Sequence, residues 1–145
     1  MKRKIVFAVA LILFAAMLVY GVYLFNRIFP EAEAINTPKA SDVISASVSV
    51  NTEATLYIDK TVDIGGDELD EIIAHLQSAN PTRKQSLNDN PSTKPFYIIE
   101  LHTAKATYQY FVYREGTKIY IEMPYTGIYI SDTELFGLVL KYFEN

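Results

Sequence analysis

The longest apolar segment of the chain runs from Ile5 to Phe25 and contains no charged residue. An α-helix rises about 1.5 Å per residue, so roughly 20 apolar residues cross the roughly 30 Å hydrocarbon core of a bilayer. This pattern predicts a transmembrane signal anchor. Residues 1–29 are interpreted as a cytoplasmic tip followed by the membrane span.

Basic residues at the two ends of this segment predict its orientation. Residues 2–4 are Lys-Arg-Lys, whereas only Arg27 follows the apolar run closely, and an excess of basic residues normally stays in the cytoplasm. The rest of the chain is therefore expected outside the cytoplasm, behind a single pass through the cell membrane. The alternative is a cleaved signal peptide, because residues 32–34 have the small-x-small form of a cleavage site. Cleavage after Ala34 would release a secreted domain.

The chain beyond the anchor is predicted to form one linker and one domain. Residues 30–41 are polar and contain two prolines, which is typical of a linker. Residues 42–145 are expected to form an extracytoplasmic domain. Apolar and serine residues alternate over residues 44–50, which predicts a strand, and residues 56–58 are expected to continue as the second strand of a hairpin.

An amphipathic helix follows in the pattern. Leu69, Ile72, Ile73 and Leu76 recur at helical spacing. The acidic residues from Asp67 onward complement the positive end of the helix dipole. Pro81 is expected to end the helix at about Asn80.

Three strands fit together as an antiparallel meander, at residues 96–102, 107–114 and 117–123. The first hairpin opposes Tyr110 to Ile99. The second, with Glu115-Gly116 as its turn, opposes Tyr110 to Ile121. Both hairpins place Tyr110 and Val112 on the same face, so the two registers agree.

The opposite face of this meander carries an unusual number of large apolar side chains, namely Phe96, Ile98, Phe111, Tyr113 and Tyr120. We expect a helix to cover it, and the alternative is an exposed aromatic patch that binds a partner. A short strand over residues 125–130 precedes a helix over 132–143, whose N-cap is predicted at Ser131. The fold class is therefore α+β: an antiparallel β-sheet meander with two packed helices, preceded by one N-terminal transmembrane helix.

Charge and cysteine content narrow the functional classes. All 17 acidic residues follow the apolar segment, whereas four of the 13 basic residues (Lys2, Arg3, Lys4 and Arg27) flank it. Such an acidic domain repels nucleic acid, which is excluded as a partner. The chain has no cysteine, so disulfides, thiolate metal sites and a lipoprotein anchor are excluded.

No catalytic motif stands out in the sequence. Glu71 and His75 lie four residues apart, but two ligands are too few for a metal site, and we interpret them as a solvated helix face. The acidic stretch 59–70 has Ile64 and Asp70 at the positions where a calcium-binding loop has glycine and glutamate. No nucleophile elbow or phosphate-binding loop is present. The chain is interpreted as a non-enzyme without cofactor or metal, although a carboxylate pair for sugar hydrolysis stays open as an alternative.

One polar segment does suggest binding. Residues 81–89 place Arg83 and Lys84 side by side in an otherwise acidic domain. Basic residues beside hydroxyls and amides can hold a carboxylate or phosphate, whereas a solvated loop is the simpler interpretation. The candidate binding residues are Arg83, Lys84, Gln85, Ser86, Phe111, Tyr113 and Tyr120.

The segment Pro-Thr-Arg-Lys-Gln-Ser at 81–86, a strand meander, and Tyr-Ile-Glu-Met-Pro-Tyr-Thr-Gly-Ile-Tyr at 120–129 together resemble the family called domain of unknown function 5301. The resemblance covers roughly Val43 to Phe143. Met123 departs from it, because the family pattern usually has Gln there. The resemblance implies a small exported or membrane-anchored protein of Gram-positive bacteria and implies no activity.

The sequence thus favours a non-enzymatic binding or sensing module of the bacterial envelope. Its expected partners are the membrane, through residues 5–25, and either an envelope protein or an anionic ligand. Two alternatives stay open: an envelope hydrolase with an unrecognised acid pair, and a structural subunit of a membrane complex. A carboxylate buried beside His102 or within the aromatic face would favour the hydrolase, whereas an open aromatic patch beside Arg83 and Lys84 would favour binding.

Overall fold

The computed structural model describes residues 2–52 and 58–144, and the chain divides into two compact units between Glu31 and Ala32. The first unit contains α1 (Lys2–Ile28). Its span Arg3–Ile28 is long and apolar enough to cross a membrane. The helix predicted from the apolar run is therefore present, and it fits a single-pass membrane anchor.

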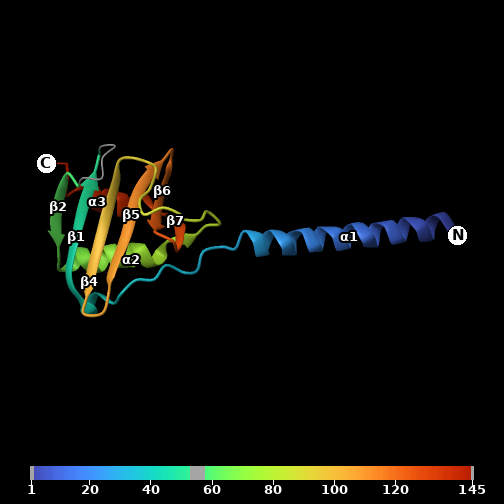
Figure 1. Ribbon diagram of the computed structural model, residues 1–145, viewed down its shortest axis with the longest axis horizontal. Coiled ribbons are helices and arrows are strands. Elements are labelled where there is room, and N and C mark those ends of the chain that lie inside the picture. Colours follow the sequence, from blue (N-terminus) through green and yellow to red (C-terminus); the bar gives the residue numbers. More distant parts are fainter. Residues whose placement is uncertain (1, 53–57, 145) are drawn as a thin grey trace. The chain divides into compact units, whose positions relative to one another are not determined.

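The second unit is built on one antiparallel sheet (Figure 1). Within the described ranges, seven strands lie in the order β2-β1-β4-β5-β6-β7-β3. The α+β class is confirmed. The elements of this unit are the 3-10 turn η1 (Ala40–Asp42), β1 (Val43–Asn51), β2 (Lys60–Ile64), α2 (Asp67–Ser78), β3 (Asn80–Pro81), β4 (Phe96–Thr103), β5 (Thr107–Glu115), β6 (Lys118–Met123), β7 (Gly127–Ser131) and α3 (Thr133–Leu140).

The main core lies between the sheet and the two helices, which Figure 1 shows behind the strands. As the pattern predicts, Ile72, Ile73 and Leu76 of α2 are buried. They pack with Tyr110 and Ile121, both fully buried on the facing side of the sheet. Burying each such side chain contributes about 1.5–3 kcal/mol, so this face supplies most of the driving force for folding.

The opposite face of the sheet has a different cover from the one expected. We call it the aromatic face, and its buried residues are Phe96, Ile98, Phe111, Tyr113, Tyr120 and Ile128. The expected helix is absent there because α2 and α3 both pack in the main core. The segment 82–95, named here the cover loop, lies over the face instead. Because this face also holds the buried carboxylate of Glu122, a polar loop can satisfy it, whereas an apolar helix cannot.

Strand pairing confirms one predicted register and corrects the other. Tyr110 lies opposite Ile99 between β4 and β5, as predicted. Between β5 and β6, however, Ile121 lies opposite Val112 rather than Tyr110. The turn uses Gly116 as its first central residue, with φ 61°. The predicted turn would have placed Glu115 there, where only glycine is relaxed. A slip of two residues leaves every side chain on its predicted face.

The partner of β1 and the cap of α3 also differ from expectation. Of the predicted strand 56–58, Ile58 lies outside any strand, and residues 56 and 57 lie outside the described ranges. Lys60–Ile64 pairs with β1 instead. The N-cap of α3 is Asp132, whose side chain accepts a hydrogen bond from the Leu135 amide. Ser131 is held in the sheet opposite Ile119 and is not the cap.

Most of the predicted linker belongs to the folded domain. The Ala32 amide donates to the Thr82 carbonyl at 2.9 Å, and the Tyr110 hydroxyl donates to the Asn36 carbonyl at 2.6 Å. Pro38 is buried. The apolar side chains of the segment pack against the main core, so the domain begins at Ala32 and not at residue 42.

Candidate ligand site on the aromatic face

Among the residues that the structure describes, the aromatic face contains one buried carboxylate, that of Glu122 on β6. Glu122 is only 6% exposed. The Ser86 hydroxyl of the cover loop donates to Glu122 Oε1 at 2.6 Å. Burial, together with the neighbouring Glu122, raises the pKa of Tyr113. Tyr113 therefore stays neutral and can act as a hydrogen-bond donor toward this carboxylate. A carboxylate buried this deeply requires such donors, because a buried polar group without a hydrogen-bond partner is costly.

Lys84 lies at the edge of the same face. Its Nζ is 3.2 Å from Glu115 Oε2 and 4.4 Å from the centre of the Tyr120 ring. The hydrogen bond to Glu115 raises the pKa of Lys84, so the ammonium is charged. The Tyr120 ring in turn stacks on Tyr113 with 5.7 Å between ring centres. Cation, ring and carboxylates thus form one connected group of side chains.

Several contacts hold the cover loop in place. At its start, the Thr82 hydroxyl donates to the Ile128 carbonyl at 2.6 Å. In its middle, the Tyr125 hydroxyl donates to Asp89 Oδ1, also at 2.6 Å. At its end, the Lys94 ammonium donates to Asn51 Oδ1 at 2.8 Å. The loop is fixed at three points over the sheet, which preorganises the surface beneath it.

Two hollows open between the cover loop and the sheet. One of about 260 Å³ is lined by the polar residues Lys84, Gln85, Asn88, Glu115 and Glu122 together with Leu87, Ser92, Thr93, Tyr113 and Ile128. The other, of about 430 Å³, is lined by Phe96, Ile98 and Phe111 and by polar loop residues such as Asp89 and Lys94. Concave sites that combine ring faces with a few placed polar groups are typical of ligand pockets.

The seven residues proposed from the sequence are distributed over this region. Lys84, Gln85 and Tyr113 line the smaller hollow, and Phe111 lines the larger one. The Tyr120 ring contacts the Lys84 ammonium, and the buried Ser86 hydroxyl donates to Glu122. Arg83 is exposed and lines neither of these hollows.

The aromatic residues are therefore the floor of a covered site rather than an open patch. Sequence reasoning missed Glu122 as its central group. The signal was available, since Glu122 falls on the aromatic side of the period-2 alternation, where a charge must find partners.

The fold and this site define a small α+β domain that carries a loop-covered, partly polar pocket. The chain belongs to the family DUF5301, whose description reads "Domain of unknown function (DUF5300)", and the match covers residues 31–130. That range begins with the segment docked on the domain and includes the cover loop and Glu122. A search of curated proteins gave no match.

A solved structure shares the fold. It is the "NMR structure of the protein from Ruminococcus gnavus", which is 28% identical to this chain with a TM-score of 0.50. The similarity covers 68% of this chain and 91% of the other. The likeness supports the architecture of the domain and carries no statement about activity.

Proposed function

We propose that the protein is a single-pass membrane protein whose domain binds or senses a molecule of the bacterial envelope outside the cytoplasm, without enzymatic activity. The observation that carries the proposal is the hollow of about 260 Å³, in which Lys84 and Gln85 of the cover loop lie beside Tyr113. Polar side chains around such a hollow are positioned to exchange hydrogen bonds with a ligand.

The lining of the pocket indicates the chemistry of its ligand. Glu122, Gln85 and Asn88 suit a molecule rich in hydroxyl or amide donors. Lys84 suits an anionic group, because its ion pair with Glu115 is exposed. Such pairs contribute only about 0–1 kcal/mol, so a ligand carboxylate can replace Glu115 at little cost. The expected ligand is a hydroxyl- and amide-bearing envelope molecule that carries a carboxylate.

Ligand binding can be tested on the full-length protein in detergent micelles. Backbone NMR spectra would be recorded while N-acetylmuramic acid is added, with N-acetylglucosamine as the matched sugar that lacks the carboxylate. The acid should shift signals of the cover loop and β6 and bind more tightly than the neutral sugar. Lys84→Ala should abolish that preference, whereas Lys105→Ala, in the exposed turn between β4 and β5, should keep it. Equal effects of both sugars, or of both substitutions, would contradict the role of Lys84.

The location outside the cytoplasm rests on the basic residues at positions 2–4. Alkaline phosphatase fused after Asn145 should be active, because that enzyme matures only outside the cytoplasm. An inactive phosphatase fusion, together with an active cytoplasmic reporter at the same position, would reverse the orientation.

A hydrolase is the second candidate, and Glu122 favours it, because Glu122 is the carboxylate buried within the aromatic face that was expected of a hydrolase. Glu115 and Glu122 line the same hollow, and two carboxylates flanking a sugar bond are the machinery of glycoside hydrolysis. The test is release of soluble fragments from purified envelope polysaccharide by the full-length protein. Fragments released by the wild type and not by Glu122→Gln would establish the enzyme and overturn the binding-only proposal.

A further inference from the structure

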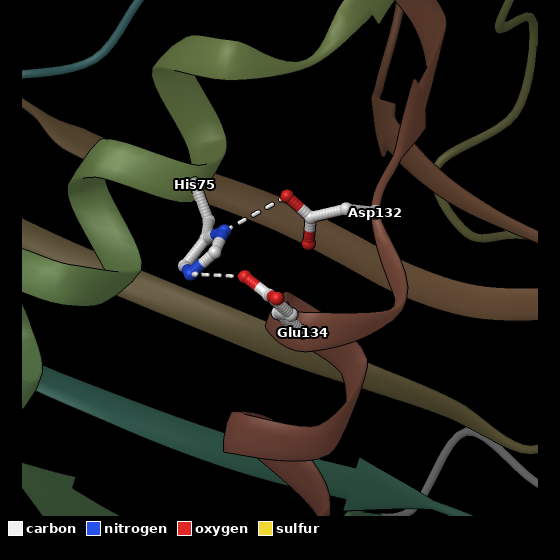
Figure 2. Close-up of side chains that lie close together, drawn as sticks. All are labelled: His75, Asp132 and Glu134. Carbon is white, nitrogen blue, oxygen red and sulfur yellow. Dashed lines mark hydrogen bonds and ion pairs between the residues drawn. The ribbon is translucent and has the colours of Figure 1, made fainter.

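A group of metal-type ligands lies at the junction of α2 and α3, away from the aromatic face (Figure 2). His75 projects from α2 toward Asp132 and Glu134 at the start of α3. One ligand atom from each of the three lies within 4.8 Å of the others. The sequence paired His75 with Glu71 on its own helix. The fold instead brings His75 together with two carboxylates that lie far along the chain.

The contact with Asp132 fixes the state of the imidazole ring. Asp132 Oδ2 lies 2.9 Å from His75 Nδ1, and an ionised carboxylate can only accept. Nδ1 therefore carries a proton, and in the neutral ring the lone pair is on Nε2. Asp132 cannot easily turn away, because its other oxygen accepts from the Leu135 amide at 2.9 Å. A carboxylate that holds one ring nitrogen while the other faces outward is the usual support of a metal-binding histidine.

The remaining nitrogen faces the second carboxylate. His75 Nε2 is 3.9 Å from Glu134 Oε2, which is longer than a hydrogen bond of about 2.7–3.2 Å. Zinc lies about 2.0–2.2 Å from nitrogen and oxygen ligands, so two ligand atoms of one ion are separated by up to about 4 Å. The side chain of Glu134 is 79% exposed. It is therefore free to adjust its distance to an ion.

We propose that His75, through Nε2, and Glu134 bind a divalent cation of the zinc class between α2 and α3, with Asp132 as the positioning residue. Imidazole and carboxylate ligands suit zinc. Two protein ligands are fewer than the three or four of ordinary zinc sites, so the proposed site is a weak one in which water fills the remaining positions. Such an ion joins the two helices that cover the main core. Asp132 and Glu134 lie beyond residue 130, where the family match ends. The site is independent of the ligand pocket.

Zinc titration of the full-length protein in detergent micelles tests the proposal, with calorimetry for affinity and histidine ¹⁵N NMR for the ligand atom. One saturable site should appear, and the His75 Nε2 signal should move. Glu134→Gln and His75→Gln should weaken binding at least about tenfold. Asp132→Asn should weaken it about 10–100-fold, as loss of a supporting carboxylate does, while its amide oxygen still caps α3.

His102→Gln is the matched control, because His102 is the other histidine of the chain. Its Nδ1 lies 2.9 Å from the Thr107 hydroxyl, away from the three residues of the proposed site in the sequence. The variant should bind zinc like the wild type. Glu134 is exposed, so its variant separates loss of a ligand from loss of the fold, which far-ultraviolet circular dichroism would verify. No saturable binding at millimolar zinc, or equal affinity in the Glu134→Gln variant, would overturn the proposal. The contact would then be a plain ion pair between protonated His75 and Glu134.

Discussion

The bond between Ser86 and Glu122 should decide whether the cover loop stays on the aromatic face. Ser86 is 4% exposed and Glu122 is 6% exposed, so Ser86→Ala removes a hydrogen-bond donor from a carboxylate that has little contact with water. Hydrogen bonds to charged groups contribute about 1.5–3 kcal/mol. Ser86→Ala should therefore lower the free energy of unfolding by about 2 kcal/mol.

The assay is urea unfolding of the full-length protein in detergent, followed by tyrosine fluorescence. Ser92→Ala is the control, because Ser92 is exposed on the same loop, and it should cost less than about 0.5 kcal/mol. Glu122→Gln keeps an acceptor but removes the charge. The double variant with Ser86→Ala should then show a coupling energy of at least about 0.5 kcal/mol. Equal costs for Ser86→Ala and Ser92→Ala would refute the reasoning.

Two further predictions concern the core. Ile121→Ala should cost about 2–5 kcal/mol through a cavity in the main core, and Ser47→Ala, on the aromatic side of β1, well under about 1 kcal/mol. Equal urea midpoints for these two variants would contradict the assigned faces. Burial raises the pKa of Tyr110 and Tyr142 above the value of about 10 in the unfolded chain. The contribution of these two tyrosines to stability should thus be constant below about pH 10 and fall above it. A urea midpoint that does not decrease above about pH 10 would contradict the burial of Tyr110.

Local patterns predicted much of this fold. The apolar stripe of α2 and the alternation in β4 and β5 depend on neighbouring residues, and the register of Tyr110 with Ile99 follows from the spacing of two strands around a short turn. The β5–β6 register was wrong by two residues because it depends on backbone angles at Gly116. The alternation of hydrophobic residues cannot reveal such a slip, because a shift of two residues leaves every side chain on the same face of the sheet.

Contacts between residues far apart in the sequence could not be predicted from such local patterns. Nothing near residues 82–95 indicates that a polar loop, rather than a helix, covers the aromatic face. Nothing near His75 points to Asp132, which lies 57 residues away. Both follow from how the helices share the other face of the sheet. The candidate residues Lys84 and Ser86 were found from the sequence, but their partners Glu115 and Glu122 required the fold.

Gly127 leaves the space in which the segment that begins at Ala32 packs on the domain. A Cβ at Gly127 would approach the Cβ of Ala32 to 2.5 Å, so this glycine makes room for residues that also form the small-x-small motif at 32–34. A side chain at position 127 would displace Ala32, whose amide donates to the Thr82 carbonyl at the start of the cover loop. The absence of a side chain at Gly127 therefore lets one short segment both begin the domain and hold the cover loop at its first residue.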